Sequence, residues 1–197
     1  MTAAAIREAT AADRTAIAAM LGRAFADDPA MSYVFPDPVV RTKRLPRLFA
    51  LLLDEDSAGM RLVTGHSQAA TLWQAPGRTP PSLVYMLRHA LPLIGALGTA
   101  IPRALRVADA IDEHAPPQRH WYLHIAGVDP GSQGQGLGKG SIREGLARVA
   151  VDGMPAYLET ATESNVGLYQ SLGFAVTGEW HVPKGGPKFW SMLRPPD

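Results

Sequence analysis

The sequence of 197 residues contains no cysteine. The absence of thiols excludes disulfides, thiolate zinc sites and a cysteine nucleophile, so any group transfer by this chain must avoid a cysteine-bound intermediate. Neither sign of charge dominates, because 19 Lys and Arg stand against 18 Asp and Glu, for a net charge of +1. Without a basic surface or an acidic tail, the composition predicts no nucleic-acid partner.

Long apolar runs are also scarce. The stretch that comes nearest to a membrane span, residues 83–101, is interrupted by Arg88, His89 and Pro92, whereas a spanning helix needs about 20 apolar residues with few or no charges. We expect a covered helix of a soluble protein here and no membrane partner. The first residues lack a basic region before an apolar run, which predicts no signal peptide and a cytoplasmic location. The six histidines show no metal-binding spacing, so we expect no metal site.

Apolar residues make up 46% of the chain, enough for one core, and we expect a single domain over residues 1–197. Apolar spacing in the first part of the chain predicts strands and helices. The expected strands are residues 6–8, 60–64 and 69–74, and the expected helices 10–25, 40–53, 83–91 and 104–111. A loop is expected over residues 30–38, and a proline-rich loop, 75–81, leads to Ser82 as a helix N-cap.

The last third of the chain alternates between strand and helix patterns. Strands are predicted over 121–128, 155–160, 174–181 and 188–193, and a helix over 164–172. Another helix is expected after a glycine-rich turn, with apolar positions at Ile142, Leu146, Val149 and Ala150. This alternation indicates an α/β fold, with a mixed sheet and helices packed on its faces.

A glycine-rich segment, residues 128–141, joins the first of these strands to a helix. Backbone amides without Cβ obstruction at a helix start suit a pyrophosphate. The segment is not a P-loop, because Gln133 stands at the first glycine position and Gly140 follows Lys139 where Ser or Thr is required. It is not a dinucleotide fingerprint either, since Lys139 or Ser141 occupies its last glycine position.

Gln133, Gly136 and Gly138 fit the pattern Gln/Arg-x-x-Gly-x-Gly/Ala, which resembles the coenzyme A pyrophosphate loop of the GNAT superfamily of N-acetyltransferases. Residues 158–174 are similar to the second half of the same family core. Within the superfamily, the chain looks most like the puromycin N-acetyltransferase branch. The features that carry this likeness are the chain length, residues 121–123 and 156–160, and Val182 and Pro183 near the C-terminal end. The resemblance implies a mostly antiparallel central sheet, splayed at the cofactor site, with helices on both faces and a cofactor-binding core at about 120–175.

The same resemblance implies an enzyme that moves the acetyl group of acetyl-CoA directly to a primary amine of a small, possibly antibiotic-like molecule. A non-catalytic acyl-CoA-binding module, a structural α/β domain and a protein-amine acetyltransferase remain alternatives, and the sequence does not indicate an oligomeric state. By the family pattern the Val128 amide faces the thioester carbonyl. The cofactor-binding residues implied are Gly127, Val128, Gln133, Gly134, Gln135, Gly136, Leu137, Gly138, Lys139 and Asn165.

Tyr169 is the catalytic acid implied by the family, and it lies four residues after Asn165 on one helix face. Glu159 is the first candidate for the base that deprotonates the amine, and His124, on one strand face with two other polar aromatic residues, is the second. If Glu159 is the base, Glu159→Gln should depress activity most at low pH, where few amines are free. The expected acceptor-binding helices lie within residues 27–53 and 83–111. The candidate pocket residues are Asp27, Asp28, Met31, Tyr33, Trp73 and Trp121.

Overall fold

The computed structural model describes residues 5–77 and 83–196. The predicted N-cap Ser82 and residues 78–81 of the proline-rich loop lie outside them. Seven strands form one sheet in the order β1-β2-β3-β4-β5-β7-β6. The β4–β5 pair is parallel and the other pairs are antiparallel. The strands are β1 (Ile6–Glu8), β2 (Met60–Thr64), β3 (Ala69–Gln74), β4 (Trp121–Val128), β5 (Ala156–Thr160), β6 (Ala175–His181) and β7 (Lys188–Arg194).

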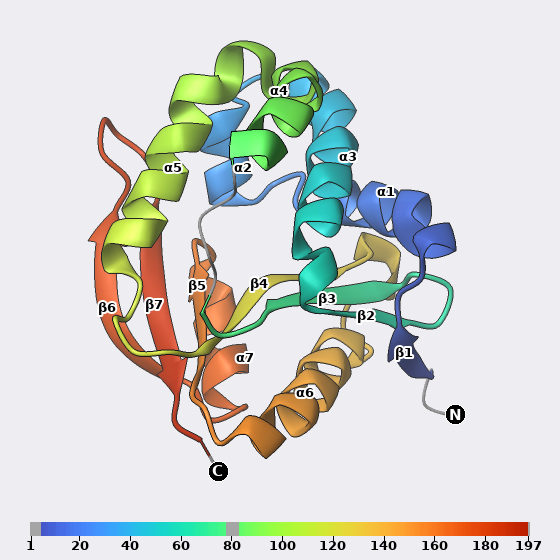
Figure 1. The fold of residues 1–197 in the computed structure, drawn as a ribbon, viewed down its shortest axis with the longest axis vertical. Helices are drawn as coiled ribbons and strands as arrows, with labels where there is room; N and C mark the ends of the chain where they lie inside the picture. Colours follow the sequence, from blue (N-terminus) through green and yellow to red (C-terminus); the bar gives the residue numbers. More distant parts are fainter. Residues whose placement is uncertain (1–4, 78–82, 197) are drawn as a thin grey trace.

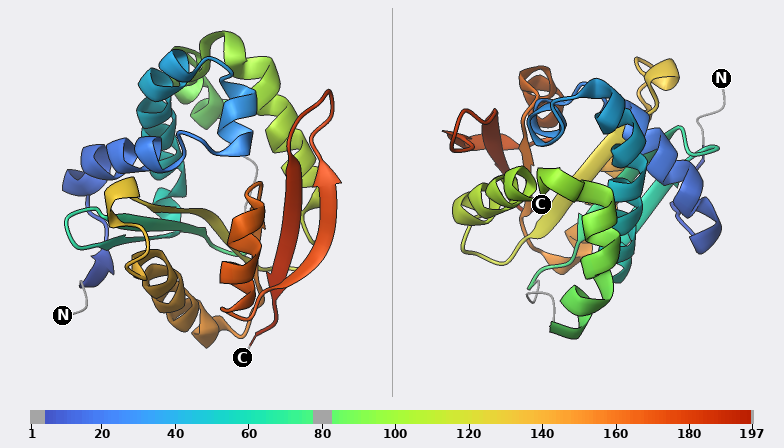
Figure 2. Two further views of the ribbon diagram at one scale, coloured as in Figure 1. Left: turned by 180° about the vertical axis from the view of Figure 1, so that it is seen from behind. Right: turned by 90° about the horizontal axis from the view of Figure 1, so that it is seen from above.

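Helices cover both faces of the sheet (Figure 1), as the predicted α/β class requires. The first face carries α1 (Arg14–Ala24), α2 (Pro29–Val34), α3 (Pro38–Glu55), α4 (Leu83–Leu97) and α5 (Ile101–His114). The second carries α6 (Leu137–Val149) and α7 (Val166–Gln170). Two views from behind and above show that α3, α4 and α5 form a separate layer over the sheet (Figure 2).

Helix α2 lies where the sequence pattern predicts a loop. The Asp28 carboxylate accepts a hydrogen bond from the Met31 amide at 3.0 Å, and Pro29 occupies the first helical position. An aspartate N-cap followed by proline favours a helix start. That signal was present in the sequence, and the prediction of a loop over residues 30–38 was wrong.

The core has two parts, one on each face of the sheet. On the first face α1, α2, α3 and α5 pack against β2 and β3, with Leu21, Phe35, Leu45 and Phe49 among the buried side chains. On the second face α6 and α7 pack against β3, β4, β5 and β7 around a set of large side chains. The second set includes Trp73, Ile142, Leu146, Leu158, Leu172, Phe174 and Met192.

The sheet splits between β4 and β5. These strands pair only at Trp121 with Ala156 and at Tyr122 with Tyr157. Beyond these pairs the two strands diverge. In Figure 1, β2, β3 and β4 run roughly horizontally, whereas β5, β6 and β7 run roughly vertically. The sheet is therefore splayed, as the family pattern predicts.

A β-bulge lies in β4 at His124. Leu72 of β3 pairs with Ile125, and Trp73 pairs with Leu123, so His124 is an extra residue between the two pairs. Gly127 lies three residues later and pairs regularly with Ala70 of β3. Bulges re-aim side chains next to functional sites.

Gly127 lacks a side chain because helix α1 passes over it. A Cβ atom there would lie 2.5 Å from Leu21 Cδ2 and 3.2 Å from Phe25 Cε2. We predict that Gly127→Ala lowers the free energy of unfolding by about 1–3 kcal/mol, the usual cost of overpacking. Urea denaturation measures this change. The control is Gly95→Ala, because no atom lies within 4 Å of a Cβ at that exposed position; equal stability of the two variants would contradict the packing argument.

The segment predicted as a covered helix is only partly covered. In α4 the side chains of Leu91 (80% exposed), Leu93 and Ile94 face solvent, while Ala96 and Leu97 are buried. Within the described residues, the continuous helical stretch Ala90–His114 is long and apolar enough to cross a membrane by length and composition, with 22% of its most apolar window buried. The prediction of a covered helix was wrong for this part of the segment, because α4 packs against α3 and α5 on one side while its other side faces solvent.

Candidate active site

The glycine-rich loop begins where β4 ends and is anchored at its first residue. The Asp129 carboxylate pairs with Arg23 of α1 and accepts a hydrogen bond from the Gly131 amide at 3.1 Å. The Asp129 amide donates to the Gln68 carbonyl at 2.8 Å. The loop is thus fixed to both α1 and the β2–β3 turn.

Two glycines of this loop adopt a left-handed backbone that other residues rarely take. Gly134 and Gly136 both have a φ of +76°, and Gly136 is the N-cap of α6. A helix begins with amide groups that lack an acceptor within the helix. The amides of Leu137 and Gly138 are therefore available to a ligand at this position.

The glycine-loop cavity, about 630 Å³ in volume, lies over this helix start. It is large enough for a small-molecule ligand. All predicted cofactor-binding residues except Gln135 line it, including Asn165. The lining residues are Ala24, Phe25, Asp27, Asp28, Ala126, Gly127, Val128, Ser132, Gln133, Gly134, Gly136, Leu137, Gly138, Lys139, Ile142, Thr162, Ser164, Asn165, Leu168 and Tyr169.

The chemistry of this lining suits an extended ligand with phosphate groups. The start of α6 carries the positive end of the helix dipole, and Lys139 adds a cation. At Gly138 a Cβ would lie 2.8 Å from Val128 Cγ2, so only glycine allows α6 to begin this close to β4. The structure therefore presents the loop amides and the end of β4 to the same cavity.

Tyr169 lines the glycine-loop cavity and is 7% exposed. Its ring meets Phe174 edge-on, with centroids 6.1 Å apart. Burial, and then the negative charges of Glu159 and Asp28, raise the pKa of Tyr169 to about 12. The phenol is therefore fully protonated at neutral pH and is a potential proton donor.

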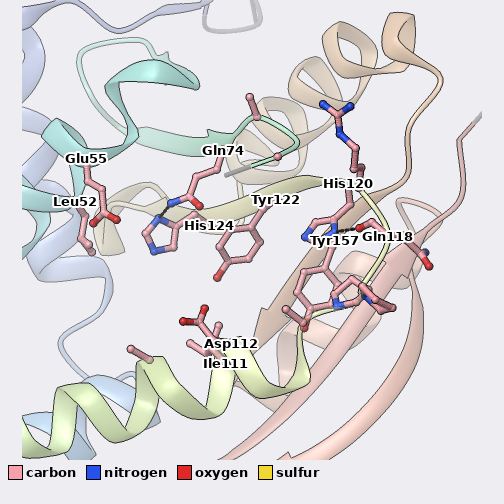
Figure 3. A pocket seen from close by; sticks show the side chains of 17 residues that line it. Leu52, Glu55, Gln74, Ile111, Asp112, Gln118, His120, Tyr122, His124 and Tyr157 are labelled. Atoms are coloured by element: carbon pink, nitrogen blue, oxygen red, sulfur yellow. Dashed lines mark hydrogen bonds between the residues drawn. The ribbon is translucent and has the colours of Figure 1, made fainter. Parts of the chain in front are cut away.

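A second cavity, the β4–α5 cavity, has a volume of about 580 Å³. Side chains from β3 and β4 face Ile111 and Asp112 of α5 across it (Figure 3). The lining residues are Leu52, Glu55, Gln74, Ala75, Gly77, Ala108, Ile111, Asp112, Ala115, Pro116, Pro117, Gln118, Arg119, His120, Tyr122, His124 and Tyr157. Successive parts of β4 line the two cavities. Tyr122 and His124 line the β4–α5 cavity, and residues 126–128 line the glycine-loop cavity.

Glu159 lies on β5 beyond the divergence and lines neither cavity. Its Oε1 accepts a hydrogen bond from the Tyr122 hydroxyl, whereas Oε2 is buried and has no hydrogen-bond partner among the described residues. Burial raises the pKa of Glu159 to about 7, against the opposing effects of Tyr122 and the charge of His124. This carboxyl group can take up or release a proton near neutral pH.

His124 reaches the β4–α5 cavity from the bulge, and a carboxylate holds its ring. His124 Nδ1 lies 2.7 Å from Asp56 Oδ2, and Gln74 Nε2 lies 2.5 Å from Asp56 Oδ1. Asp56 comes from the 3₁₀ turn after α3, and its side chain is 0% exposed. Burial lowers the pKa of His124, but the hydrogen bond and charge of Asp56 outweigh burial, so the pKa lies above its ordinary value. Sequence reasoning missed Asp56 and Gln74.

The residues proposed from sequence as an acceptor pocket do not line this second cavity. Trp73 is fully buried, and the Tyr33 hydroxyl donates to the Pro183 carbonyl at 3.2 Å. Asp27 and Asp28 line the glycine-loop cavity instead. The helices expected to bind the acceptor do line the β4–α5 cavity, but only with the C-terminal ends of α3 and α5. Met31, Trp121 and the other four candidates all lie elsewhere in the fold.

Among the described residues no group of three or more His, Asp or Glu side chains is placed to hold a metal ion. Two pairs of titratable side chains where β4 and β5 diverge are instead bonded to each other, Glu159 with Tyr122 and His124 with Asp56. A carboxyl group and an imidazole in such pairs can take up and release protons.

Comparison with known proteins agrees with this arrangement. Residues 52–174 match the family model described as the acetyltransferase (GNAT) family. Short segments resemble the mycothiol acetyltransferases of Streptomyces scabiei, 38% identical over 55 residues, and Nocardiopsis dassonvillei, 40% identical over 57 residues. These segments are 26% and 27% of this chain but only 18% and 17% of the relatives, so the match spans less than a fifth of either relative.

Two solved structures have the same fold over nearly the whole chain. A protein of Corynebacterium glutamicum, described as histone acetyltransferase HPA2 and related acetyltransferase, is 25% identical with a TM-score of 0.77, covering 100% of this chain and 98% of that one. Arylalkylamine N-acetyltransferase 2 of Aedes aegypti is 16% identical with a TM-score of 0.63, covering 98% and 99%. Because the family match covers more than half of the sequence, the chain belongs to the acetyltransferase (GNAT) family.

Proposed function

We propose that this acetyltransferase moves the acetyl group of acetyl-CoA to a primary amine of a small molecule. The observation that carries the proposal is the pair of cavities on successive parts of β4, linked by Glu159, which accepts a hydrogen bond from Tyr122 of one cavity and acts electrostatically on Tyr169 of the other. One cavity has the amides and cation for a pyrophosphate, and the other has acidic and apolar groups for an amine. A direct transfer needs the two substrates to meet where β4 and β5 diverge.

The glycine-loop cavity fits acetyl-CoA, which supplies the acetyl group already activated as a thioester. The amides between Gln133 and Lys139 bind the pyrophosphate. The diverging end of β4 offers the Val128 amide to the thioester oxygen, where negative charge develops as the amine attacks. Asn165 lies beside this path in the same cavity.

The loop amides give a direct binding prediction. Gly136→Val should weaken acetyl-CoA binding at least about tenfold, because valine cannot adopt the φ of +76° cheaply and the loop must move. Calorimetric titration measures the affinity. Gly153→Val is a matched control: its φ is +58°, it also has open space around it, and it lies outside the glycine-loop cavity. Equal affinity of both variants and the wild type would remove the loop from the binding site.

Two proton transfers accompany the acetyl transfer, and Tyr169 and Glu159 carry out one each. Tyr169 donates its phenolic proton to the departing sulfur, and Glu159 takes a proton from the nitrogen that has formed the new bond. The negative charge of Glu159 is one cause of the high pKa of Tyr169. Once Glu159 is protonated that charge is gone, so Tyr169 becomes a stronger acid at the moment when the sulfur needs its proton. Glu159 then returns the proton to Tyr169.

The β4–α5 cavity favours a cationic amine with an apolar body. Glu55 and Asp112 provide negative charge, while Leu52, Ile111 and Tyr157 provide apolar surface. Attraction of an ammonium group by carboxylates and aromatic faces is expected in such a site. Solved structures with this fold include arylalkylamine and polyamine N-acetyltransferases, which agrees with a small acceptor. The puromycin branch would correspond to an aminonucleoside acceptor.

The test is release of the coenzyme A thiol from acetyl-CoA with a panel of acceptors. The panel holds 2-phenylethylamine, agmatine, a polyamine, puromycin and an N-terminal peptide. We expect turnover with at least one small amine. Acetyl-CoA binding by calorimetry without turnover on any acceptor would favour a non-catalytic binding module. A peptide preferred about a hundredfold over every small amine, a difference of about 2.7 kcal/mol, would show a protein acceptor.

A further inference from the structure

Acetyl transfer to an amine removes two protons from the acceptor nitrogen. At neutral pH a primary alkylamine is an ammonium ion, since its pKa is close to the value of about 10.4 for lysine. One proton must leave before the lone pair can attack, and a second leaves after the C–N bond has formed. Glu159 takes the second proton, and Tyr169 gives a proton to the sulfur, so this proton stays within the site. The first proton must reach solvent by another route.

We propose that His124, held by Asp56, takes this first proton in the β4–α5 cavity. The step converts the ammonium ion to the free amine: the N–H bond breaks, its electron pair stays on nitrogen, and the proton binds His124 Nε2. The imidazolium then gives the proton to solvent through the open cavity. This inference rests on the proposed acetyl transfer and adds His124 as a catalytic residue and Asp56 as a positioning residue.

The bulge in β4 is the first observation that supports this role. Because His124 is the extra residue between two paired positions, it is turned out of the regular ladder, and its ring lines the cavity beside Tyr122 (Figure 3). The two rings are stacked with centroids 5.3 Å apart. The His124 side chain keeps 18% exposure, so a proton on it can reach water.

The Asp56 contact determines which nitrogen of His124 can accept a proton. His124 Nδ1 lies 2.7 Å from Asp56 Oδ2 and 3.0 Å from Gln74 Nε2. Because a carboxylate only accepts, and Gln74 Nε2 donates to Asp56 Oδ1 at the shorter distance of 2.5 Å, Nδ1 carries the hydrogen that bridges to Oδ2. Asp56 Oδ1 is occupied by the Gln74 amide. Nε2 is then the nitrogen with a free lone pair. A buried carboxylate with these two partners fixes the tautomer and stabilises the imidazolium when it forms.

The groups around His124 favour the uptake of a proton. The negative charges of Asp56, Glu159 and Glu55 all raise its pKa, and Asp112 faces the same cavity from α5 (Figure 3). The other polar neighbours are Tyr122 on β4 and Gln74 on β3. These same charges attract the ammonium ion, so the acceptor is brought to the base that deprotonates it.

A second histidine in the cavity lacks these features. His120 Nδ1 lies 2.7 Å from the Gln118 carbonyl, and its ring meets Tyr157 edge-on. A carbonyl fixes a tautomer but gives an imidazolium less support than a buried carboxylate does. The structure therefore distinguishes His124 from His120, which the alternating pattern of β4 places on the same face.

The experiment compares two acceptors of equal size, 2-phenylethylamine and its 2,2-difluoro analogue. Fluorine withdraws electron density, so the analogue is far less basic and a much larger fraction of it is the free amine at neutral pH. At pH 7 we expect His124→Gln to lower kcat/KM for 2-phenylethylamine about 100-fold, but for the analogue about threefold or less. The loss with 2-phenylethylamine should shrink as the pH rises toward the pKa of its ammonium group. His181→Gln, on the exposed edge of β6, should match the wild type.

Asp56 is tested through the pH profile. In the wild type kcat/KM for 2-phenylethylamine should rise with pH through the pKa of His124, above the ordinary histidine value. Asp56→Asn removes the negative charge that raises this pKa, so the rising limb should move to lower pH. Imidazole NMR titration of His124 should show the same shift of pKa without any acceptor, which keeps the test decisive if neither amine is turned over.

Three results would overturn the inference. His124→Gln could lower kcat/KM equally for both amines while the protein stays folded, which would make His124 structural. The rise of kcat/KM with pH could occur at the same pH in Asp56→Asn as in the wild type. The imidazole of His124 in the wild type could also titrate below the ordinary histidine pKa. In each case acetylation by the wild type would leave the proposed function intact. Absence of turnover with every amine of the panel would instead remove the proposed function.

Discussion

Tyr169→Phe should lower kcat about 10²–10⁴-fold and leave acetyl-CoA affinity unchanged, because the hydroxyl contributes proton delivery and not binding. The ring keeps its edge-on contact with Phe174, so the variant should fold as the wild type does. Thiol release under conditions where chemistry limits the rate measures kcat, and calorimetry measures affinity.

Tyr33→Phe is the control for this substitution. Its hydroxyl donates to the Pro183 carbonyl, and neither cavity includes it. The control should keep the wild-type kcat. A wild-type kcat in Tyr169→Phe as well would leave Tyr169 with a packing role only.

Glu159→Gln should lower kcat by a similar factor of about 10²–10⁴ at pH 8. The carboxyl group has a pKa of about 7, so wild-type kcat should rise with pH through 7 as the carboxylate forms. Glutamine still accepts the hydrogen bond of the Tyr122 hydroxyl but cannot take up a proton. The variant should therefore have a low kcat that does not rise with pH through 7. A defect of the same size at pH 5.5 and pH 8 would argue against proton uptake by Glu159.

The stability of the protein gives an independent check on this pKa. Burial raises the carboxyl pKa in the folded protein from its ordinary 4.5. The unfolded chain therefore loses its proton at lower pH than the folded one, and the free energy of unfolding should fall as the pH rises from 4.5 to 7. Glu159→Gln should lack this fall. Urea denaturation of both proteins at pH 5 and pH 8 measures the difference.

The pH dependence of Glu159→Gln shows what sequence reasoning could not reach. From sequence, the defect is expected to be largest at low pH, where few amines are free. The structure reverses the expectation, because a carboxyl that the fold buries is itself protonated at low pH and has little to lose there. Burial depends on α5 and β4 packing over β5, which no local pattern encodes.

Several elements followed from the sequence because their signals are local. Two short apolar runs joined by the turn Gly65–Ser67 predicted β2 and β3 with their observed ends, 60–64 and 69–74. The glycine spacing at 133–138 predicted the loop at the start of α6, since a left-handed backbone at Gly136 requires that residue. Asn165 and Tyr169 line one cavity because they are four residues apart at a helix start.

Tertiary structure alone decided the second cavity and its proton-transfer groups. Asp56, Gln74 and His124 are separated by up to 68 residues in the chain, yet they form one hydrogen-bonded group. The bulge that turns His124 into the cavity arises from the pairing of β4 with β3, and the position of Glu159 from the divergence of β4 and β5. Sequence spacing determines which residues share an element. Which carboxylates are buried, and beside which bases, depends on how distant elements pack, and burial sets their pKa values.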